Sequence, residues 1–141
     1  MSNLVIGYGV QGQKRALNID SSEKIYIYDP HLKNRNIISN LEDFNFNLIQ
    51  NVYICTPDNL KEFYINKFLK LKKNILIEKP LILRQSVLEN IKKRSKAKFY
   101  TAYNHRFEPH IVKIKELLDQ NFIGKVYHIN IYYGNGTIKL W

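Results

Sequence analysis

Short apolar runs alternate with amphipathic stretches along most of the chain. The apolar runs predict buried strands over residues 4–6, 24–28, 37–39, 51–55, 74–77 and 98–103. The amphipathic stretches have helical spacing and predict helices over residues 10–19, 60–71, 86–94 and 109–121. Strands and helices that alternate in this order are typical of an α/β fold, a Rossmann-like doubly wound parallel sheet.

The apolar positions also predict which side each helix buries. Asp58 or Asn59 is expected to cap the 60–71 helix, and Ser39 or Asn40 to cap one helical turn at 41–44. The expected inward residues of three helices are Leu60, Phe63, Tyr64, Phe68 and Leu71, then Val87, Leu88 and Ile91, then Ile111, Ile114, Leu117 and Leu118. Gly124 is expected to end the last of these helices.

The final stretch has a different period. Residues 126–133 alternate, with Tyr127, Ile129, Ile131 and Tyr133 on one face, which predicts a long strand of a one-faced antiparallel sheet. The pattern therefore predicts a first domain over residues 1–123 and the start of a second, truncated domain over 124–141.

A glycine-rich turn follows the first predicted strand. Gly7, Gly9 and Gly12 have the G-x-G-x-x-G spacing of dinucleotide-binding turns. In such turns the first glycine permits the tight turn, the second lets the backbone approach a pyrophosphate, and the third lets the helix pack on the strand. The helix that begins at about Val10 and Gln11 offers free N–H groups to the phosphates.

An acidic residue stands where this motif needs one. Asp29 ends the second predicted strand, 22 residues after Gly7, where a carboxylate can bind the hydroxyls of an adenosine ribose. The alternative is an α/β domain without a ligand, in which Asp29 only caps the next turn. The combination of strand, turn, helix, strand and acid favours the dinucleotide site.

Composition and charge exclude several other classes. The net charge of +10 suggests nucleic-acid binding, but the lysines lie at the ends of predicted helices and no recognition module is visible, so solvated helix ends are favoured. No apolar run is long enough to cross a membrane. The single cysteine, Cys55, suits a reducing cytoplasm and predicts a buried structural thiol. No metal-binding cluster is expected.

Four stretches at the ends of predicted strands resemble the N-terminal half of the Gfo/Idh/MocA oxidoreductases. They are Gly7–Gly12, Cys55-Thr56-Pro57, Glu78-Lys79-Pro80 and Tyr103-Asn104-His105-Arg106-Phe107. The resemblance covers essentially the whole chain. It implies a nicotinamide cofactor across the carboxyl ends of the strands, NAD in the first place, and hydride transfer at a hydroxyl or carbonyl carbon of a sugar, polyol or nucleotide sugar.

The resemblance also implies roles for single residues. Lys79 would be the catalytic residue, bound to the substrate hydroxyl, with a pKa lowered by partial burial beside the nicotinamide. Glu78 would orient Lys79 or contact the ribose, and Thr56 and Pro57 would form a wall of the cofactor site, with Thr56 also able to cap the next helix. Asn104 would lie near the nicotinamide.

Some assignments stay open. His105 and Arg106 would contact substrate, although His105 is equally well a loop histidine and Arg106 can instead pair with an acid. Asp29 favours NAD over NADP, whereas nearby His31, Lys33 and Arg35 leave NADP possible.

The sequence also departs from the family pattern. Lys61 stands where the family often has a histidine, and the segment between residues 29 and 52 is short for a full crossover. The family's second domain, which carries a further acid and histidine, would be cut after one strand. With that domain present, the resemblance implies a homo-oligomer. The alternative function is a non-catalytic dinucleotide-binding or interaction module.

Overall fold

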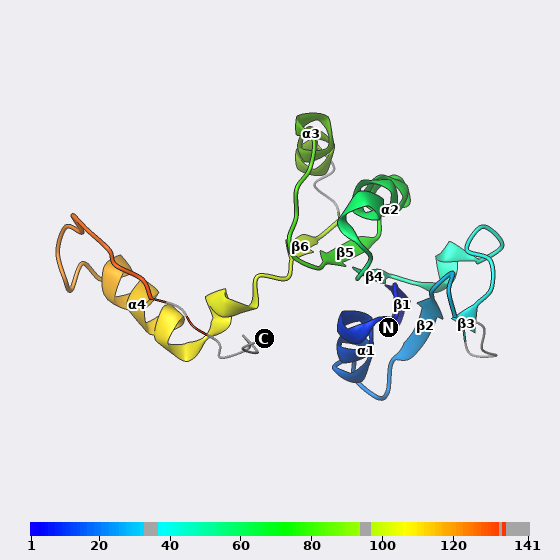
Figure 1. The fold of residues 1–141 in the computed structure, drawn as a ribbon, viewed down its shortest axis with the longest axis horizontal. Helices are drawn as coiled ribbons and strands as arrows, with labels where there is room; N and C mark the ends of the chain where they lie inside the picture. The colour runs from blue at the N-terminus through cyan, green and yellow to red at the C-terminus, as the bar shows by residue number, and fades with distance from the viewer. Residues whose placement is uncertain (33–36, 94–96, 133, 135–141) are drawn as a thin grey trace, which may run out of the picture. The chain divides into compact units, whose positions relative to one another are not determined.

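The computed structural model describes residues 1–32, 37–93, 97–132 and 134. Its centre is a sheet of parallel strands in the order β3-β2-β1-β4-β5-β6 (Figure 1). The strands are β1 (Ser2–Ile6), β2 (Lys24–Tyr28), β3 (Ile37–Ile38), β4 (Asn51–Ile54), β5 (Asn74–Ile77) and β6 (Phe99–Thr101). The order places β1 between β2 and β4, so the chain changes direction across the sheet at β1, as in doubly wound folds.

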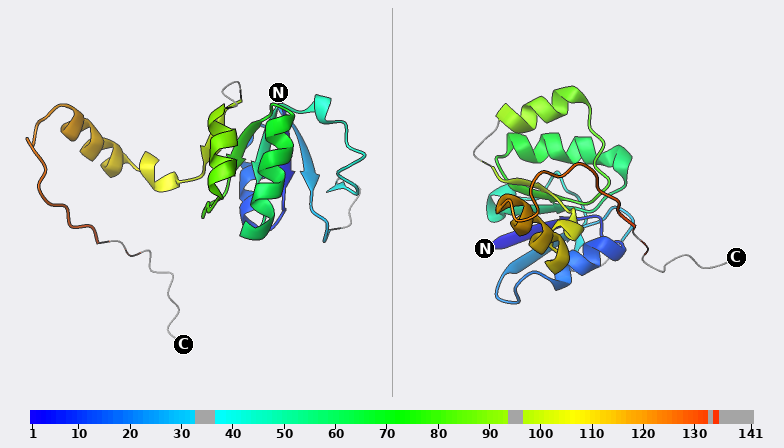
Figure 2. Two further views of the ribbon diagram at one scale, coloured as in Figure 1. Left: turned by 90° about the horizontal axis from the view of Figure 1, so that it is seen from above. Right: turned by 90° about the vertical axis from the view of Figure 1, so that its left-hand side faces the viewer.

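Helices cover both faces of this sheet. The described helices are α1 (Val10–Leu17), α2 (Asp58–Lys70), α3 (Gln85–Lys93) and α4 (Pro109–Asp119), with short 3₁₀ turns η1 (Phe46–Leu48) and η2 (Asn104–Phe107), and the first three lie against the sheet. In Figure 2, α1 lies on one face and α2 and α3 lie on the other. The predicted doubly wound α/β fold is therefore confirmed for the strands and helices of residues 1–103.

The core lies between the central strands and α2. Leu4, Val5 and Ile6 are completely buried, because β1 has a strand on each side and a helix on each face. On the α2 side, Ile65 and Phe68 are also completely buried. The central strands consequently read as continuous apolar runs, which is what made them visible in the sequence.

An asparagine ladder, formed by Asn3, Asn51 and Asn74, crosses the amino ends of β1, β4 and β5. These residues are in register, and the Asn51 Nδ2 donates to Asn3 Oδ1 at 3.0 Å while Asn74 Nδ2 donates to Asn51 Oδ1 at 2.9 Å. At one end Asn3 Nδ2 donates to Glu23 Oε2 at 2.7 Å, and at the other Asn74 Oδ1 accepts from the Lys98 N–H at 3.1 Å. The ladder therefore joins the strands at the end of the sheet opposite the glycine turn.

The chain forms two compact units, residues 1–103 and residues 104–141. The first holds all six strands of the sheet, and the second holds η2 and α4. The boundary between structural units lies between Tyr103 and Asn104. The predicted domain boundary after residue 123 stays a prediction.

The strand expected at 126–133 is absent from the described part of that stretch. Residues 126–132 have no regular secondary structure, and residue 133 lies outside the described residues. The alternation is present, but a strand needs a neighbouring strand to bind its N–H and C=O groups, and none of the described strands pairs with residues 126–132. The alternation of apolar and polar residues alone was therefore not enough to predict a strand.

The buried face of α2 is rotated from the predicted one. Its buried residues are Lys61, Tyr64, Ile65, Phe68 and Leu69, whereas the predicted inward residues Leu60, Phe63 and Leu71 are 40%, 59% and 39% exposed. Tyr64 and Phe68 are buried as predicted, whereas the prediction was wrong for the other three because α2 has apolar residues on several sides and a lysine occupies one inward position. In α3, Leu88 is likewise exposed, while Val87 is buried as expected.

The expected caps are confirmed only in part. Pro57 is the N-cap of α2, and Asp58 lies in its first turn, so neither Asp58, Asn59 nor Thr56 caps this helix. The stretch 41–44 is a simple turn rather than a helical one, although Asn40 does cap it, its Oδ1 accepting from the Glu42 N–H at 3.1 Å. The 3₁₀ turn η1 follows and is capped by Asn45, whose side chain accepts from the Asn47 N–H at 3.0 Å. Asparagine favours such caps because its short side chain reaches the backbone two residues ahead.

Three broader expectations can be compared with the described residues. Between Asp29 and Leu32 there is no crossover helix, in agreement with the shortness of that segment; Lys33 and Arg35 lie outside the described residues. None of the described helices has the length and apolar character that a membrane span requires. Among the same residues, no group of three or more His, Cys, Asp and Glu side chains is arranged for a metal ion.

Candidate functional site

The glycine turn begins directly after β1. Gly7 has a φ of +82°, which L side chains rarely adopt, and its N–H donates to the Tyr28 carbonyl at 2.9 Å. A Cβ on Gly7 would lie 2.8 Å from the Cys55 carbonyl oxygen. Both the backbone angle and the space therefore require glycine at this position, and the turn is packed tightly against the end of β4.

The other two glycines have opposite surroundings. A Cβ on Gly12 would lie 2.0 Å from the Gly7 carbonyl oxygen, so α1 packs directly on the turn. A Cβ on Gly9 would meet no atom within 4 Å. Gly9 is the N-cap of α1, and Val10 is exposed beside it. The start of α1 therefore faces open space on the side where a phosphate group would approach.

Asp29 connects the end of β2 to the glycine turn. Its Oδ2 accepts from the Tyr8 N–H at 2.8 Å, and its Oδ1 accepts from the His31 N–H at 2.9 Å. The second bond is the turn cap that the alternative interpretation expected. Because each carboxylate oxygen accepts more than one hydrogen bond, Asp29 still has acceptor capacity for the hydroxyls of a ribose.

The end of β4 supplies another side of the site. The Cys55 N–H donates to the Ile6 carbonyl at 2.8 Å, which continues the sheet past the last residue of β4. The hydroxyl oxygen of Thr56 is buried and has no hydrogen-bond partner among the described residues. A buried hydroxyl without a protein partner is uncommon, so the Thr56 hydroxyl can hydrogen-bond to a bound ligand.

Cys55 itself is partly buried, as the sequence suggested for a structural thiol. Burial, and after it the nearby Glu78 carboxylate, raises the pKa of the Cys55 thiol to about 12. A thiol with so high a pKa is protonated at neutral pH and is a poor nucleophile.

Glu78 and Lys79 follow β5 at the same edge of the sheet. The Glu78 N–H donates to the Ile54 carbonyl at 2.9 Å, and its side chain is almost completely buried. The Arg15 Nε of α1 lies 2.6 Å from Glu78 Oε1, so the carboxylate is held by an ion pair across 63 residues of sequence. Lys79 is exposed and is joined to Pro80 by a cis peptide bond.

Sequence reasoning missed the environment of this turn. Lys61 of α2 is only 2% exposed, and its Nζ donates to the Pro80 carbonyl at 2.5 Å and to Asp58 Oδ1 at 2.7 Å. Arg15 was also missed as the partner of Glu78. The available signal for Lys61 was its position, four residues after Pro57, where the resembling family often has a histidine.

Asn104, His105 and Arg106 belong to the other compact unit, in η2. The His105 Nδ1 contacts the Glu108 carboxylate, and the Arg106 guanidinium lies 5.5 Å from the centre of the Phe107 ring. All three are exposed. Their expected places beside the nicotinamide and the substrate stay predictions.

The residues of the first unit fit a dinucleotide. Open space at Gly9, the start of α1, the partnerless Thr56 hydroxyl and the Asp29 carboxylate all follow strands that end at one edge of the parallel sheet. Ligands of open α/β sheets bind at this edge, next to the place where the strand order reverses. The four features supply a phosphate site, a hydroxyl donor and a ribose acceptor.

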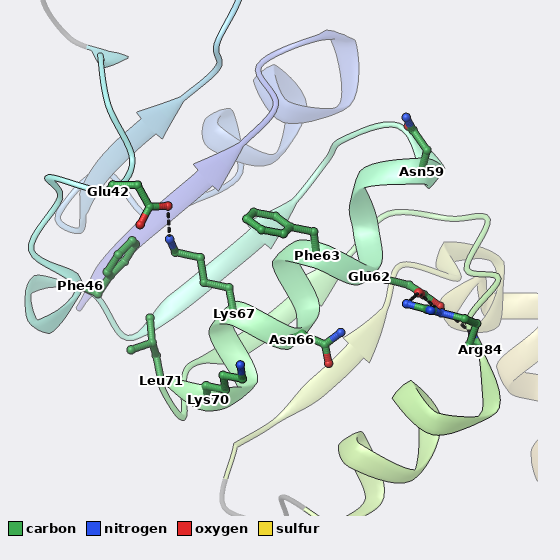
Figure 3. A pocket seen from close by; sticks show the side chains of 10 residues that line it. All are labelled: Glu42, Phe46, Asn59, Glu62, Phe63, Asn66, Lys67, Lys70, Leu71 and Arg84. Atoms are coloured by element: carbon green, nitrogen blue, oxygen red, sulfur yellow. Dashed lines mark hydrogen bonds and ion pairs between the residues drawn. The ribbon is translucent and has the colours of Figure 1, made fainter.

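A separate hollow lies on the outer surface of α2 (Figure 3). It has a volume of about 820 Å³ and includes the ion pairs Lys67–Glu42 and Arg84–Glu62, both at 2.6 Å. Its charged groups face one another rather than a common centre, as Figure 3 shows. None of the residues predicted from the sequence as site residues lines it.

Comparison with known proteins gives the family. The model of the Gfo/Idh/MocA family, an oxidoreductase family with an NAD-binding Rossmann fold, matches residues 1–104. Oxidoreductase P35 of Formosa agariphila is 40% identical over 82 residues, which are 56% of this chain and 26% of that protein. Inositol 2-dehydrogenase of Rhizobium meliloti is 33% identical over 86 residues, 59% of this chain and 26% of that protein. The chain thus spans about a quarter of the length of these curated relatives.

Solved structures show the same fold. Scyllo-inositol dehydrogenase of Lactobacillus casei, with bound NAD(H) and scyllo-inositol, matches with a TM-score of 0.72 at 22% identity, over 88% of this chain and 42% of that one. A probable dehydrogenase of Thermotoga maritima matches with a TM-score of 0.71 at 24% identity, over 89% of this chain and 42% of that one. With the family model covering residues 1–104, the chain belongs to the Gfo/Idh/MocA oxidoreductases, a family with an NAD-binding Rossmann fold.

Proposed function

We propose that this chain is the cofactor-binding part of an NAD-dependent oxidoreductase that acts on a hydroxyl or carbonyl carbon of a sugar or polyol. The observation that carries the proposal is the position of Lys79. It follows β5 at the edge of the sheet where the glycine turn follows β1, with β4 between the two strands. One extended ligand bound along that edge would contact both.

In this proposal, different residues of the first unit bind the pyrophosphate and the ribose of the cofactor. The N–H groups at the start of α1, at Val10 and Gln11, bind the pyrophosphate, which approaches through the open space at Gly9. Asp29 accepts from the ribose hydroxyls and favours NAD, because a carboxylate repels the 2′-phosphate of NADP. The Thr56 hydroxyl donates to the ligand and gains the partner that it lacks.

Lys79 acts on the substrate proton. NAD supplies the hydride acceptor or, when reduced, the hydride donor. The Lys79 amine binds the reacting hydroxyl and moves its proton as the carbon changes oxidation state. Glu78 is fixed by Arg15 and therefore holds the backbone next to Lys79 rather than exchanging protons itself. His105 and Arg106 would contact the substrate.

The substrate class rests on the relatives. Two of the proteins named above are inositol dehydrogenases, and inositols are small polyols. We therefore propose a cyclic polyol or sugar as substrate. The exposed Lys79 is compatible with a neutral, hydroxyl-rich molecule, which needs hydrogen-bond partners rather than a counter-charge. The single cysteine, protonated and partly buried, is consistent with a reducing compartment such as the cytoplasm.

Two variants test the proposal in separate steps. Titration with NADH, followed by its fluorescence, is expected to show binding by the unchanged chain and by Lys79→Ala, and loss of binding by Gly9→Val, whose side chain fills the phosphate space. Oxidation of myo-inositol or a set of sugars, followed by NADH absorbance, is expected to fall about 100-fold or more in Lys79→Ala.

The results separate the two candidate functions. Binding without any turnover that depends on Lys79 would support a non-catalytic dinucleotide-binding module. Absence of NADH binding in the unchanged chain would contradict both.

A further inference from the structure

We propose that Lys61 is a positioning residue for Lys79, acting through the carbonyl group of Pro80. This inference rests on the proposed function, because it concerns the residue to which that function assigns proton transfer. The geometry that supports it is a hydrogen bond from the Lys61 ammonium, on the inward face of α2, to the residue directly after Lys79.

The burial of Lys61 calls for an explanation. Its side chain is 3% exposed and lies on the same helix face as Ile65 and Phe68, where apolar residues pack against the sheet. A buried ammonium group loses its hydration, so it is destabilising unless its donors are bound. An aliphatic residue at this position would have met the packing requirement alone.

The partners of Lys61 show what the ammonium does. Asp58, three residues earlier on α2, supplies a carboxylate at 2.7 Å that is itself 54% exposed. The second partner, the Pro80 carbonyl at 2.5 Å, is 19 residues away and belongs to the turn after β5. The first contact balances the charge within the helix, and the second ties α2 to the turn that carries Lys79.

The other side of the turn is fixed in a similar way. The Glu78 carboxylate is bound by Arg15 of α1, which covers the opposite face of the sheet. Arg15, Lys61 and Glu78 all influence the ionisation of the Cys55 thiol at the end of β4, so each of the three charges lies near Cys55. Both neighbours of Lys79 in the sequence are therefore bound by cations, while the Lys79 side chain itself is exposed.

This arrangement has a consequence for the reaction. The exposed side chain of Lys79 has freedom to rotate, so its direction depends on the backbone that carries it. A small displacement of a group that transfers a proton can lower the rate strongly while cofactor binding is unchanged. Lys61 is therefore expected to affect turnover much more than affinity for NAD.

The test compares variants of two lysines on α2. Lys61→Met removes the ammonium and keeps most of the side-chain volume, and Lys61→Arg keeps a cation. Lys67→Met is the matched control, because Lys67 lies on the same helix and pairs with the exposed Glu42. The first readout is hydrogen exchange of the Glu78 N–H, with the Gly7 N–H, at the equivalent end of β1, as the internal reference.

The expected exchange result is local. Lys61→Met should accelerate exchange at Glu78 about tenfold relative to Gly7, because the turn opens without unfolding of the sheet. Lys61→Arg should restore most of the protection, and Lys67→Met should leave the ratio unchanged. Equal acceleration at Glu78 and Gly7, or none at either, would overturn the proposal, because Lys61 would then act on overall stability or not at all.

The second readout is the split between kcat and KM. In Lys61→Met, kcat should fall about tenfold while KM for NAD changes less than about twofold, with recovery in Lys61→Arg. An unchanged kcat in Lys61→Met would overturn the positioning role. If the unchanged chain has no activity, the proposed function fails, while the exchange ratio still decides whether Lys61 fixes the turn.

Discussion

Two glycines of the opening turn leave no space for a side chain. A Cβ at Gly7 would press on the Cys55 carbonyl, and a Cβ at Gly12 would press on the Gly7 carbonyl. The contacts therefore form a series from α1 through the turn to the end of β4. Gly9 stands between the two and touches nothing on its open side.

Gly12→Ala is expected to lower the free energy of unfolding by about 2–3 kcal/mol, because the added methyl group displaces α1 from the turn. Gly9→Ser is the control and should change the same quantity by less than about 0.5 kcal/mol, since serine also suits an N-cap. Urea unfolding followed by circular dichroism measures both. Similar losses in the two variants would contradict the packing described for Gly12.

The Cys55 thiol predicts a dependence of stability on alkaline pH. Its pKa is raised from 9.0 to about 12 in the folded chain, mainly by burial. Above about pH 9 the unfolded chain releases this proton while the folded chain keeps it, so the folded state loses stability as pH rises towards 12. The pKa values of Tyr53 and Tyr64 are also raised, mainly by burial, and act in the same direction.

Cys55→Ala isolates the contribution of the thiol. Urea unfolding between pH 8.5 and 10.5, both below the folded pKa of about 12, should show a smaller decline in stability for this variant than for the unchanged chain. Parallel declines would mean that the thiol ionises in the folded protein near its ordinary pKa.

At the scale of elements, hydrogen bonds between side chains join strands that the backbone already pairs. The asparagine ladder is in register on β1, β4 and β5, and each member both donates and accepts. Apolar residues at these places would leave the ends of the strands without this second connection. The ladder therefore contributes to the alignment of the central strands.

Asn51→Ala interrupts the ladder at its centre. It should lower the free energy of unfolding by about 1–3 kcal/mol, because the Asn3 and Asn74 amides each lose a partner while partly buried. Asn47→Ala, at an exposed position in η1, is the control and should have an effect within about 0.5 kcal/mol. A similar effect in both variants would show that the ladder adds no stability.

The elements differ in how far the sequence predicts them. The strands of the sheet were predictable because both faces are covered and their apolar runs are continuous. The inward face of α2 was not, since Lys61 interrupts the apolar pattern and its partner Pro80 is distant in sequence. The expected strand at 126–133 shows the same dependence on distant residues, because pairing requires a second strand.

The candidate site, like the secondary structure, was predictable from the sequence only in part. The glycine turn and Asp29 depend on local spacing, and the structure places them together at the carboxyl edge of the sheet. The ion pair of Arg15 with Glu78 joins residues 63 positions apart, and no local pattern indicates it. Residue roles towards NAD and substrate rest on the family resemblance and stay predictions.

At the scale of the whole molecule, the first compact unit contains the complete sheet. Among the residues that the structure describes, all buried apolar residues of the core lie within residues 1–103, from Leu4 to Ala102. In the second unit, Ile111, Ile114 and Leu118 of α4 are 39%, 51% and 37% exposed. Stability of the described structure therefore resides in the first unit.

A chain that ends after Tyr103 is consequently expected to fold. It should retain the circular dichroism of a parallel α/β sheet and a free energy of unfolding within about 1 kcal/mol of that of the complete chain, because a unit with its own core folds alone. Urea unfolding of both chains provides the comparison. Loss of cooperative unfolding in the shorter chain would show that residues 104–141 contribute to the core.

The packing of Gly7 and Gly12 has a thermodynamic consequence for recognition. A loop that must become ordered when it meets its ligand gives up part of the binding energy as lost conformational entropy. Here the backbone is already confined by the Cys55 and Gly7 carbonyl groups, so the receptor is preorganised. Selectivity among nucleotides then depends on how well each nucleotide fits the fixed backbone of the turn, because the turn does not change its conformation on binding.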